Sequence, residues 1–210
     1  ISKIFEKKTE NTNKTEKIYK NVRIILRLHA KQDKIYCIQE NNRGYIMEKI
    51  YETAYAKINL GLDVLGKRSD GYHEVRMVMQ SVGLSDAVEI EEGEGLVVET
   101  DHSGLAGGPD NLAWKAAELL ARCCGKIPNV HIRLNKKIFL AAGLAGGSSD
   151  AAAVMRGLSR LWQLDLTAPE LEKLAAELGS DIPFCITGGT ALAEGRGEIL
   201  TELPEAPELL

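Results

Sequence analysis

The segment from Val130 to Ala153 constrains the fold of this chain more than any other. Apolar residues alternate with polar ones from Val130 to Leu134, as in a half-buried strand, and a helical pattern runs from Ser149 to Gln163. Between them lies the turn Ala141-Ala142-Gly143-Leu144-Ala145-Gly146-Gly147-Ser148-Ser149-Asp150. A strand, a glycine-rich turn and a helix in this order direct unpaired N–H groups and the positive end of the helix dipole toward a place that a ligand can approach. The segment therefore predicts an α/β (α+β) fold with an anion site, and its plain alternative is a tight turn without a ligand.

The glycine turn lacks the two commonest nucleotide-binding motifs. No Gly-Lys-Ser or Gly-Lys-Thr follows it, so it is not a Walker loop, and it lacks the G-x-G-x-x-G spacing of a dinucleotide-binding fold. Ser148 and Ser149 put two adjacent hydroxyl groups at the start of the helix, where they can bind phosphate or a magnesium shell. We interpret the turn as the phosphate-binding loop of an ATP-dependent small-molecule kinase.

Strands are predicted on both sides of this segment. From Ala54 to Val64 apolar residues alternate strictly with a second face that carries Lys57 and Asn59, which predicts a half-buried strand. Asp70-Gly71 is a common hairpin signal, after which a second strand can return. The further expected strands are Glu74 to Leu84, Ala87 to Glu91, Leu96 to Thr100, Thr190 to Ala193 and Glu198 to Leu203.

Capping residues predict further helices. Asp110 is expected to cap a helix that Gly125 ends. The run from Thr167 to Glu170 has the form of a capping box with a proline in the first turn, and Gly179 is expected to end this helix. A short helix can begin at Ser180.

Lys57 and Asp181 are the candidate catalytic residues. Lys57 lies on the polar face of an otherwise apolar strand, so its side chain is either solvated or directed into a site. Asp181 precedes an apolar turn, and taken alone it is best explained as a helix cap. Beside an anion site, one lysine and one aspartate suffice for phosphoryl transfer, because the acid can deprotonate a hydroxyl and the cation can stabilise charge on the phosphoryl group.

Tyr72 and His73 follow the predicted hairpin turn directly. An aromatic ring and an imidazole in this position either pack structurally or form a platform for a nucleobase. In the second case the ring would stack on the base and the imidazole would pair with its edge.

The charge distribution argues against a nucleic-acid partner and marks a separate tail. Residues 1–46 carry 11 Lys or Arg against 5 acids, whereas residues 47–210 carry 15 against 25. Affinity for a phosphate backbone comes from clustered basic residues, which the acidic body lacks. Residues 1–46 are predicted to be a poorly ordered basic tail, either upstream sequence before a start at Met47 or an interaction arm. Residues 47–210 would form one ATP-binding and catalytic domain.

Cysteine spacing and hydropathy favour a cytoplasmic protein. The four cysteines have no C-x-x-C metal spacing, and a chain of 210 residues needs no disulfides. No run approaches the roughly 20 apolar residues of a membrane span. We expect no membrane partner and no protein metal site, and the oligomeric state stays open.

Five ordered motifs resemble those of the GHMP kinase superfamily. They are Ala56-Lys57-Ile58-Asn59-Leu60, Asp70-Gly71-Tyr72-His73-Glu74, Pro109-Asp110-Asn111-Leu112, the glycine turn continued to Ala152, and Gly179-Ser180-Asp181-Ile182-Pro183-Phe184. Within the superfamily they are most similar to the kinases that phosphorylate the 2-hydroxyl of 4-diphosphocytidyl-2-C-methyl-D-erythritol in the non-mevalonate isoprenoid pathway. The resemblance runs from about Tyr51 to Leu203. It implies a GHMP kinase N-terminal domain with a left-handed βαβ crossover, against the usual right-handed rule.

The resemblance also implies roles for single residues. Asp181 would be the catalytic base and Lys57 its cationic partner. The substrates would be ATP and a cytidyl diphospho-sugar alcohol, with Mg²⁺ held mainly by the ATP phosphates. The residues implied to bind them are Tyr72, His73 and Met79 for the cytidine, Asn111 and Lys136 for the adenosine, and Ala141 to Ser149 for the triphosphate.

The chain departs from the family pattern in three places. Ile138-Phe139 stands where the family has Ile-Pro, so the entry to the loop lacks a fixed φ. The family continues beyond Leu210 with a second domain, and the tail before Met47 has no counterpart, so the resemblance implies a truncated chain. Two alternatives to the kinase follow. One is a nucleotide-binding remnant without turnover. The other is a GHMP kinase acting on homoserine or mevalonate, and such a substrate has no nucleobase that Tyr72 and His73 could bind.

Overall fold

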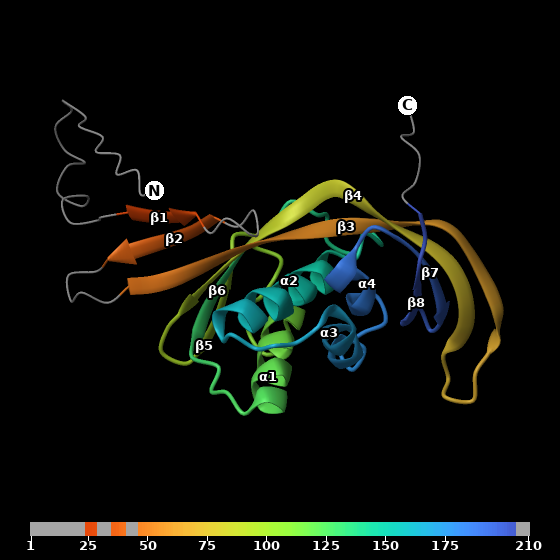
Figure 1. Cartoon of the computed structure of the whole chain (residues 1–210). Coiled ribbons are helices and arrows are strands. Elements are labelled where there is room, and N and C mark those ends of the chain that lie inside the picture. Colours follow the sequence, from red (N-terminus) through yellow and green to blue (C-terminus); the bar gives the residue numbers. More distant parts are fainter. Residues whose placement is uncertain (1–23, 29–34, 41–45, 205–210) are drawn as a thin grey trace. The chain divides into compact units, whose positions relative to one another are not determined.

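The structure is a computed structural model that describes residues 24–28, 35–40 and 46–204 (Figure 1). The chain divides into two compact units, residues 1–50 and 51–210. In the first unit β1 (Ile24–Leu28) and β2 (Ile35–Glu40) pair antiparallel, and β2 pairs with the beginning of β3 (Ile46–Lys67). The sequence predicts neither β1 nor β2, and the rest of the predicted basic tail lies outside the described residues.

β4 (His73–Glu92) is the central strand of the second unit, with β3 beside it. Its first part pairs antiparallel with β7, and its last part pairs antiparallel with β6. β5 pairs with β6 in parallel, and β8 pairs with β7 antiparallel. These strands are β5 (Leu96–Thr100), β6 (Val130–Asn135), β7 (Thr190–Gly195) and β8 (Ile199–Glu202).

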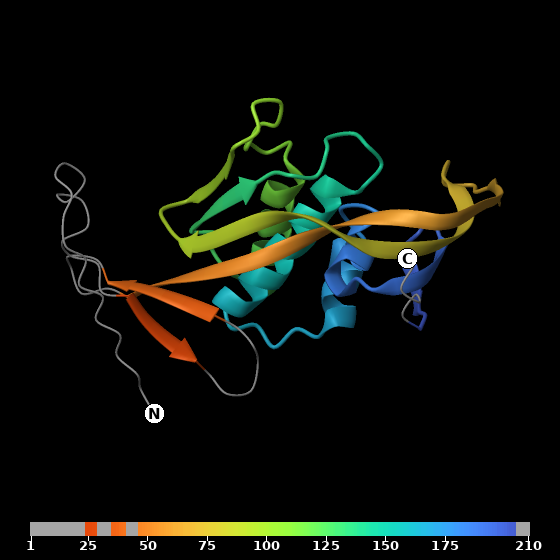
Figure 2. The same ribbon diagram turned by 90° about the horizontal axis from the view of Figure 1, so that it is seen from above.

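The helices of the second unit lie on one face of this sheet, beneath the ribbon of β3 and β4 (Figure 1, Figure 2). α2 (Gly146–Leu161) packs against α1 (Leu112–Cys124), α4 (Ile182–Thr187) and β4, while α3 (Ala168–Ala175) packs against α4. A helix in the middle of a layer must be apolar or small on most sides. The residues that meet this demand in α2 are Ala151, Ala152, Ala153, Val154, Met155, Gly157 and Leu158, all of them buried.

The mixed sheet with its layer of helices confirms the predicted α+β class. β5, α1 and β6 form the one parallel βαβ connection among the strands described in the second unit. The left-handed crossover implied by the resemblance stays a prediction.

The predicted strand from Ala54 to Val64 is confirmed as part of β3, but its apolar face is covered only in part. Ala54 and Ala56 are buried, whereas Leu60 and Val64 on the same face expose 50% and 59% of their surface. Alternation predicts which side chains share a face, but the elements that cover a face come from elsewhere in the chain. The two strands predicted between Glu74 and Glu91 are one continuous strand, β4.

Two predicted helix ends are confirmed. Gly125 ends α1 in the left-handed conformation, with φ at 63°, and Thr167 and Glu170 form a capping box at the start of α3. α3 itself ends at Ala175 and therefore does not extend to Gly179.

Two predicted helix starts are wrong by a short distance. Asn111 caps α1 in place of Asp110, because its side-chain oxygen accepts a hydrogen bond from the N–H of Ala113 (2.9 Å). α2 begins at Gly146, before the predicted Ser149, since the glycines that suggested a loop already adopt helical geometry.

Gly107 is enclosed by β5, which provides a test of the fold. A methyl group added at Gly107 would come 1.8 Å from the carbonyl oxygen of Val98, whereas one added at Gly108 would meet nothing within 4 Å. We expect Gly107→Ala to lower the free energy of unfolding by about 1–3 kcal/mol or more, because β5 must move to make room. Gly108→Ala is the matched control, and urea unfolding followed by circular dichroism compares the two. Equal stabilities would contradict the packing of β5 against Gly107.

Candidate nucleotide and catalytic site

The loop before α2 has an unusual backbone. Ala141 and Ala145 adopt left-handed φ values of 55° and 58°, and Gly143 lies between them at 73°. Left-handed alanines are uncommon and persist only where the surroundings hold them. One such restraint is the hydrogen bond that the N–H of Lys57 in β3 donates to the carbonyl of Leu144 (3.1 Å). The loop is therefore fixed against the strand that carries Lys57.

The N-terminus of α2 offers free hydrogen-bond donors. Ala145 precedes the helix and has no side chain that could cap it. Within the described part of the chain, the N–H groups of Gly146, Gly147 and Ser148 have no acceptor. A methyl group added at Gly143 would meet nothing within 4 Å, so the backbone is open to a ligand there. Free donors at the start of a 16-residue helix suit a phosphate group.

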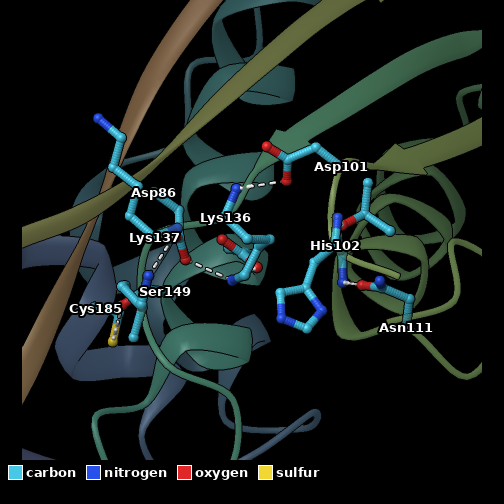
Figure 3. A network of polar contacts seen from close by, with 12 residues as sticks. Asp86, Asp101, His102, Asn111, Lys136, Lys137, Ser149 and Cys185 are labelled. Carbon is cyan, nitrogen blue, oxygen red and sulfur yellow. Dashed lines mark hydrogen bonds and ion pairs between the residues drawn. The ribbon is translucent and has the colours of Figure 1, made fainter. Parts of the chain in front are cut away.

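The two serines at this helix start have different surroundings. The hydroxyl of Ser149 is buried, donates to the carbonyl of Tyr55 and lies 3.4 Å from the sulfur of Cys185 (Figure 3). Burial raises the pKa of the Cys185 thiol to about 11, so this thiol stays neutral. Ser149 thus joins α2 to β3 and α4, and only the half-buried Ser148 keeps a hydroxyl near the open side of the loop.

Lys57 and Asp181 meet beside the loop. The Nζ atom of Lys57 lies 3.2 Å from Oδ2 of Asp181 and donates to Oδ1 of Asn59 (3.0 Å). The side chain of Lys57 is only 4% exposed, whereas that of Asp181 is 35% exposed. Asp181 stands at the N-cap position of α4 but its side chain makes no capping bond, so its interpretation as a helix cap is wrong. The pair therefore joins a sheltered cation to an accessible carboxylate.

Arg156 holds the far end of α4, and sequence reasoning missed it. Its guanidinium donates from Nη1 to the carbonyl of Cys185 (2.6 Å) and from Nη2 to the carbonyl of Thr53 (2.9 Å). Its Nε also pairs with Glu52 at 3.2 Å. An arginine that interrupts the apolar run from Ala151 to Leu158 of α2 was the available signal, because such a charge must find partners among neighbouring elements. Arg156 ties α4, and with it Asp181, to the strand of Lys57.

Lys136 and Asp86 belong to a buried ionic network (Figure 3). The ammonium of Lys136 is 2.5 Å from a carboxylate oxygen of Asp86 and 2.5 Å from one of Asp150, and all three side chains are almost fully buried. Asp86 also accepts hydrogen bonds from the N–H groups of Lys137 and Ile138 (2.8 Å for Ile138). The ammonium therefore faces the protein interior, and only the main chain of Lys136 is accessible to the adenosine expected there.

The side-chain amide of Asn111 likewise has hydrogen-bond partners within the protein. Its oxygen caps α1, and its Nδ2 donates to the carbonyl of Ala106 (2.9 Å). Its role toward adenosine stays a prediction, and any contact would have to share these groups.

The three residues expected at the cytidine differ in exposure. Tyr72 is 54% exposed and His73 is exposed at the start of β4. Met79 is fully buried and packs with Met77 and Phe184 in a hydrophobic cluster. The role of Met79 toward cytidine, which the resemblance alone implies, stays a prediction, and its side chain belongs to the hydrophobic core of the unliganded protein.

Metal and membrane signals were sought over the described residues. In residues 24–28, 35–40 and 46–204 no group of three or more His, Cys, Asp or Glu side chains is placed to hold a metal ion. In the same ranges no helix is long and apolar enough to cross a membrane.

Residues 111–189 match the family model for the GHMP kinases N terminal domain. This range includes the glycine loop, α2 and Asp181. The chain therefore contains a GHMP kinase N-terminal domain. Lys57, which is bonded to the loop through Leu144, comes from β3 and lies outside the matched range.

Curated relatives of this GHMP domain are named 4-diphosphocytidyl-2-C-methyl-D-erythritol kinase. One from Caldanaerobacter subterraneus subsp. tengcongensis is 50% identical over 159 residues, which are 76% of this chain and 55% of the relative. One from a Synechococcus strain is 54% identical over 153 residues, which are 72% of this chain and 50% of the relative. The chain thus spans about half the length of the curated relatives it matches. The resemblance inferred from the five motifs is confirmed.

Solved structures give the same fold. A crystal structure of 4-(cytidine 5'-diphospho)-2C-methyl-D-erythritol kinase has a TM-score of 0.64 and 39% identity, and the match covers 73% of this chain and 55% of that one. Homoserine kinase from Cytophaga hutchinsonii has a TM-score of 0.59 at 19% identity, covering 74% and 52%. At 19% identity, the match to homoserine kinase shows only that the two proteins share a fold.

The buried position of Lys136 leads to a stability prediction. Lys136→Gln leaves Asp86 and Asp150 buried without a cation, so we expect the free energy of unfolding to fall by about 3–5 kcal/mol. Lys137→Gln is the matched control, because Lys137 is the next residue and is exposed. Chemical denaturation of both variants measures the difference. Similar losses for the two would show that the ammonium of Lys136 is not part of a buried network.

The same network predicts a pH dependence of stability. Burial raises the pKa of Asp150 from 3.8 to about 7, and Lys136 opposes this shift only in part. Because the folded protein binds this proton more tightly than the unfolded chain, stability should fall as the pH rises from about 4 to about 7, by at most roughly 1.4 kcal/mol per pKa unit. Asp150→Asn should remove this component. Unfolding at several pH values tests it, and an unchanged pH profile in Asp150→Asn would contradict the assignment.

Proposed function

We propose that the GHMP domain binds ATP and transfers its γ-phosphoryl group to the 2-hydroxyl of 4-diphosphocytidyl-2-C-methyl-D-erythritol. The observation that carries the proposal is the contact of 3.2 Å between Lys57 and the partly exposed Asp181, next to a loop with free N–H groups. The names of relatives at about half identity supply the acceptor substrate. The reaction would belong to the non-mevalonate isoprenoid pathway.

Asp181 and Lys57 divide the chemistry between them in this proposal. The carboxylate of Asp181 takes the proton of the attacking hydroxyl, whose oxygen forms a bond to the γ-phosphorus while the bond to the β-phosphate oxygen breaks and ADP leaves. Lys57 directs the carboxylate of Asp181 through their contact of 3.2 Å, and its charge offsets the negative charge on the moving phosphoryl group. Because Lys57 is buried, its field is weakly screened by water.

The loop would hold the triphosphate. The segment from Ala141 to Ser148 supplies free N–H groups, the dipole of α2 and room for a close approach. Ser149 contributes by fixing the loop, since its hydroxyl is already bonded to β3. ATP would carry Mg²⁺ on its phosphates.

Tyr72 and His73 would recognise the cytosine of the acceptor. Both are exposed beside the hairpin turn, where a ring can stack on the base and an imidazole can pair with its edge. Met79 would support this platform from the core. Free thiols at Cys123, Cys124 and Cys185 suit the reducing cytoplasm in which we place the reaction.

Asp181→Asn tests the proposed base. We expect it to remove most of kcat while ATP binding stays nearly intact, because the amide cannot accept the proton but fills the same space. ATP-dependent phosphorylation of the cytidyl substrate by the 210-residue chain is the assay, and Asp165→Asn, an exposed carboxylate between α2 and α3, is the control. Near-normal turnover of Asp181→Asn would remove it from this role. A wild-type chain that binds ATP without turnover would support the nucleotide-binding remnant instead.

Lys57→Ala tests the cation. A loss in kcat of roughly 10²-fold or more is expected if Lys57 stabilises charge that develops during transfer. Steady-state kinetics separate this from an effect confined to KM, which would make Lys57 a binding residue. Competition by CMP completes the test of the substrate, because a kinase of homoserine or mevalonate should not respond to it.

A further inference from the structure

Arg196 differs from the other arginines near the β3–β4 turn. Arg68 is bonded to Asp70 (3.0 Å) and Glu74 (2.5 Å), and Arg76 is bonded to Glu194 (3.0 Å). Arg196 has only a loose contact, 3.5 Å between its Nε and Oε1 of Glu198. Over residues 49–204 its two Nη groups have no acceptor within hydrogen-bond distance. Its guanidinium is thus the least neutralised of the three.

The guanidinium of Arg196 is nevertheless held in place. Its Cζ lies 4.9 Å from the centre of the Tyr72 ring, a cation–π contact. Its main-chain N–H donates to Glu198 (2.6 Å). Gly195 and Gly197 on either side have φ values of 73° and 113°, which only glycine adopts readily, so the β7–β8 turn has one well-defined course. Arg196 is therefore both under-neutralised and pre-organised.

The β7–β8 turn lies between Tyr72 and Asp181. At its tip, a methyl group added to Gly197 would come 3.7 Å from Cβ of Ser180, the residue before Asp181, and 2.7 Å from the end of Met77. On its other side Arg196 stacks on Tyr72. Tyr72 and the residue before Asp181 thus both lie next to this turn, and a ligand that reaches from the Tyr72 ring to the Asp181 carboxylate would lie along it.

We propose that Arg196 binds the diphosphate of the acceptor substrate. This inference rests on the proposed function, in which Tyr72 holds the base and Asp181 meets the hydroxyl. A cytidyl diphospho-sugar alcohol carries its two phosphates between the base and the sugar alcohol, so they run past the β7–β8 turn. A planar guanidinium with two free Nη groups matches phosphate oxygens in pairs, and its stacking on Tyr72 orders it before the substrate arrives.

The test compares cytidine with CDP as ligands of the whole 210-residue chain. Calorimetric titration of the wild type should show tighter binding of CDP than of cytidine. Arg196→Gln should lose about tenfold or more of this preference, as expected for hydrogen bonds to a charged group, while its affinity for cytidine changes little. Arg196→Lys should restore part of the preference, since the charge remains and the planar fork does not.

Arg76→Gln is the matched control, because it removes the same charge at an arginine whose guanidinium is already bonded to Glu194 of β7 (3.0 Å). It should leave both affinities unchanged. An Arg196→Gln variant that keeps the wild-type preference for CDP would overturn the proposal. Equal losses for cytidine and CDP would also overturn it, because Arg196 would then act only by holding the Tyr72 ring. Thermal melting of each variant confirms that it is folded.

The wild-type titration separates this inference from the proposed function. If the wild type binds neither cytidine nor CDP, the cytidyl substrate itself is wrong and both ideas fall. If the wild type prefers CDP and phosphorylates the cytidyl substrate while Arg196→Gln behaves identically, only the role of Arg196 falls.

Discussion

The shape of the glycine loop depends on one buried ammonium group. Lys136, which directly follows β6, lies between Asp86 of β4 and Asp150 of α2, so three elements meet at a single charge. Asp86 also accepts hydrogen bonds from the main-chain N–H groups of Lys137 and Ile138 and so fixes the entry to the loop. In the interior such charges are tolerated only when each has a partner. The network therefore sets where the loop begins and where α2 starts, and the donors at the start of α2 follow from that.

The fold could be predicted from the sequence wherever a local pattern decides the structure. Alternation indicated β3 and β6, and Gly125 and Thr167 marked helix ends that the structure confirms. The alternation of apolar and polar residues was insufficient where elements from elsewhere in the chain determine burial or strand length. The exposure of Leu60 and Val64 depends on what covers the sheet, and the continuity of β4 depends on β6 and β7 pairing with its two parts.

The site divides in the same way. Lys57, Asp181 and the loop could be found because their residue types are rare in apolar or glycine-rich surroundings, and the structure brings them together. The ion pair between the ammonium of Lys136 and the carboxylate of Asp86 could not be predicted, since the two residues are 50 positions apart and no spacing rule links them. Arg156 stands in an apolar run of α2, which was a usable signal, whereas Arg196 in its turn carried none. Only the geometry reveals that Arg156 holds α4 and that Arg196 stacks on Tyr72.

The left-handed alanines of the loop have a consequence for the entropy of binding. Holding Ala141 and Ala145 at positive φ costs about 1–2 kcal/mol each, a cost that glycine would avoid. Alanine, however, visits far fewer conformations than glycine when a loop is free. A loop already confined to one course loses little freedom when a triphosphate arrives, so more of the attraction between its N–H groups and the phosphates would appear as affinity. The rigid loop would thus lower the folding stability of the domain and raise its affinity for the triphosphate.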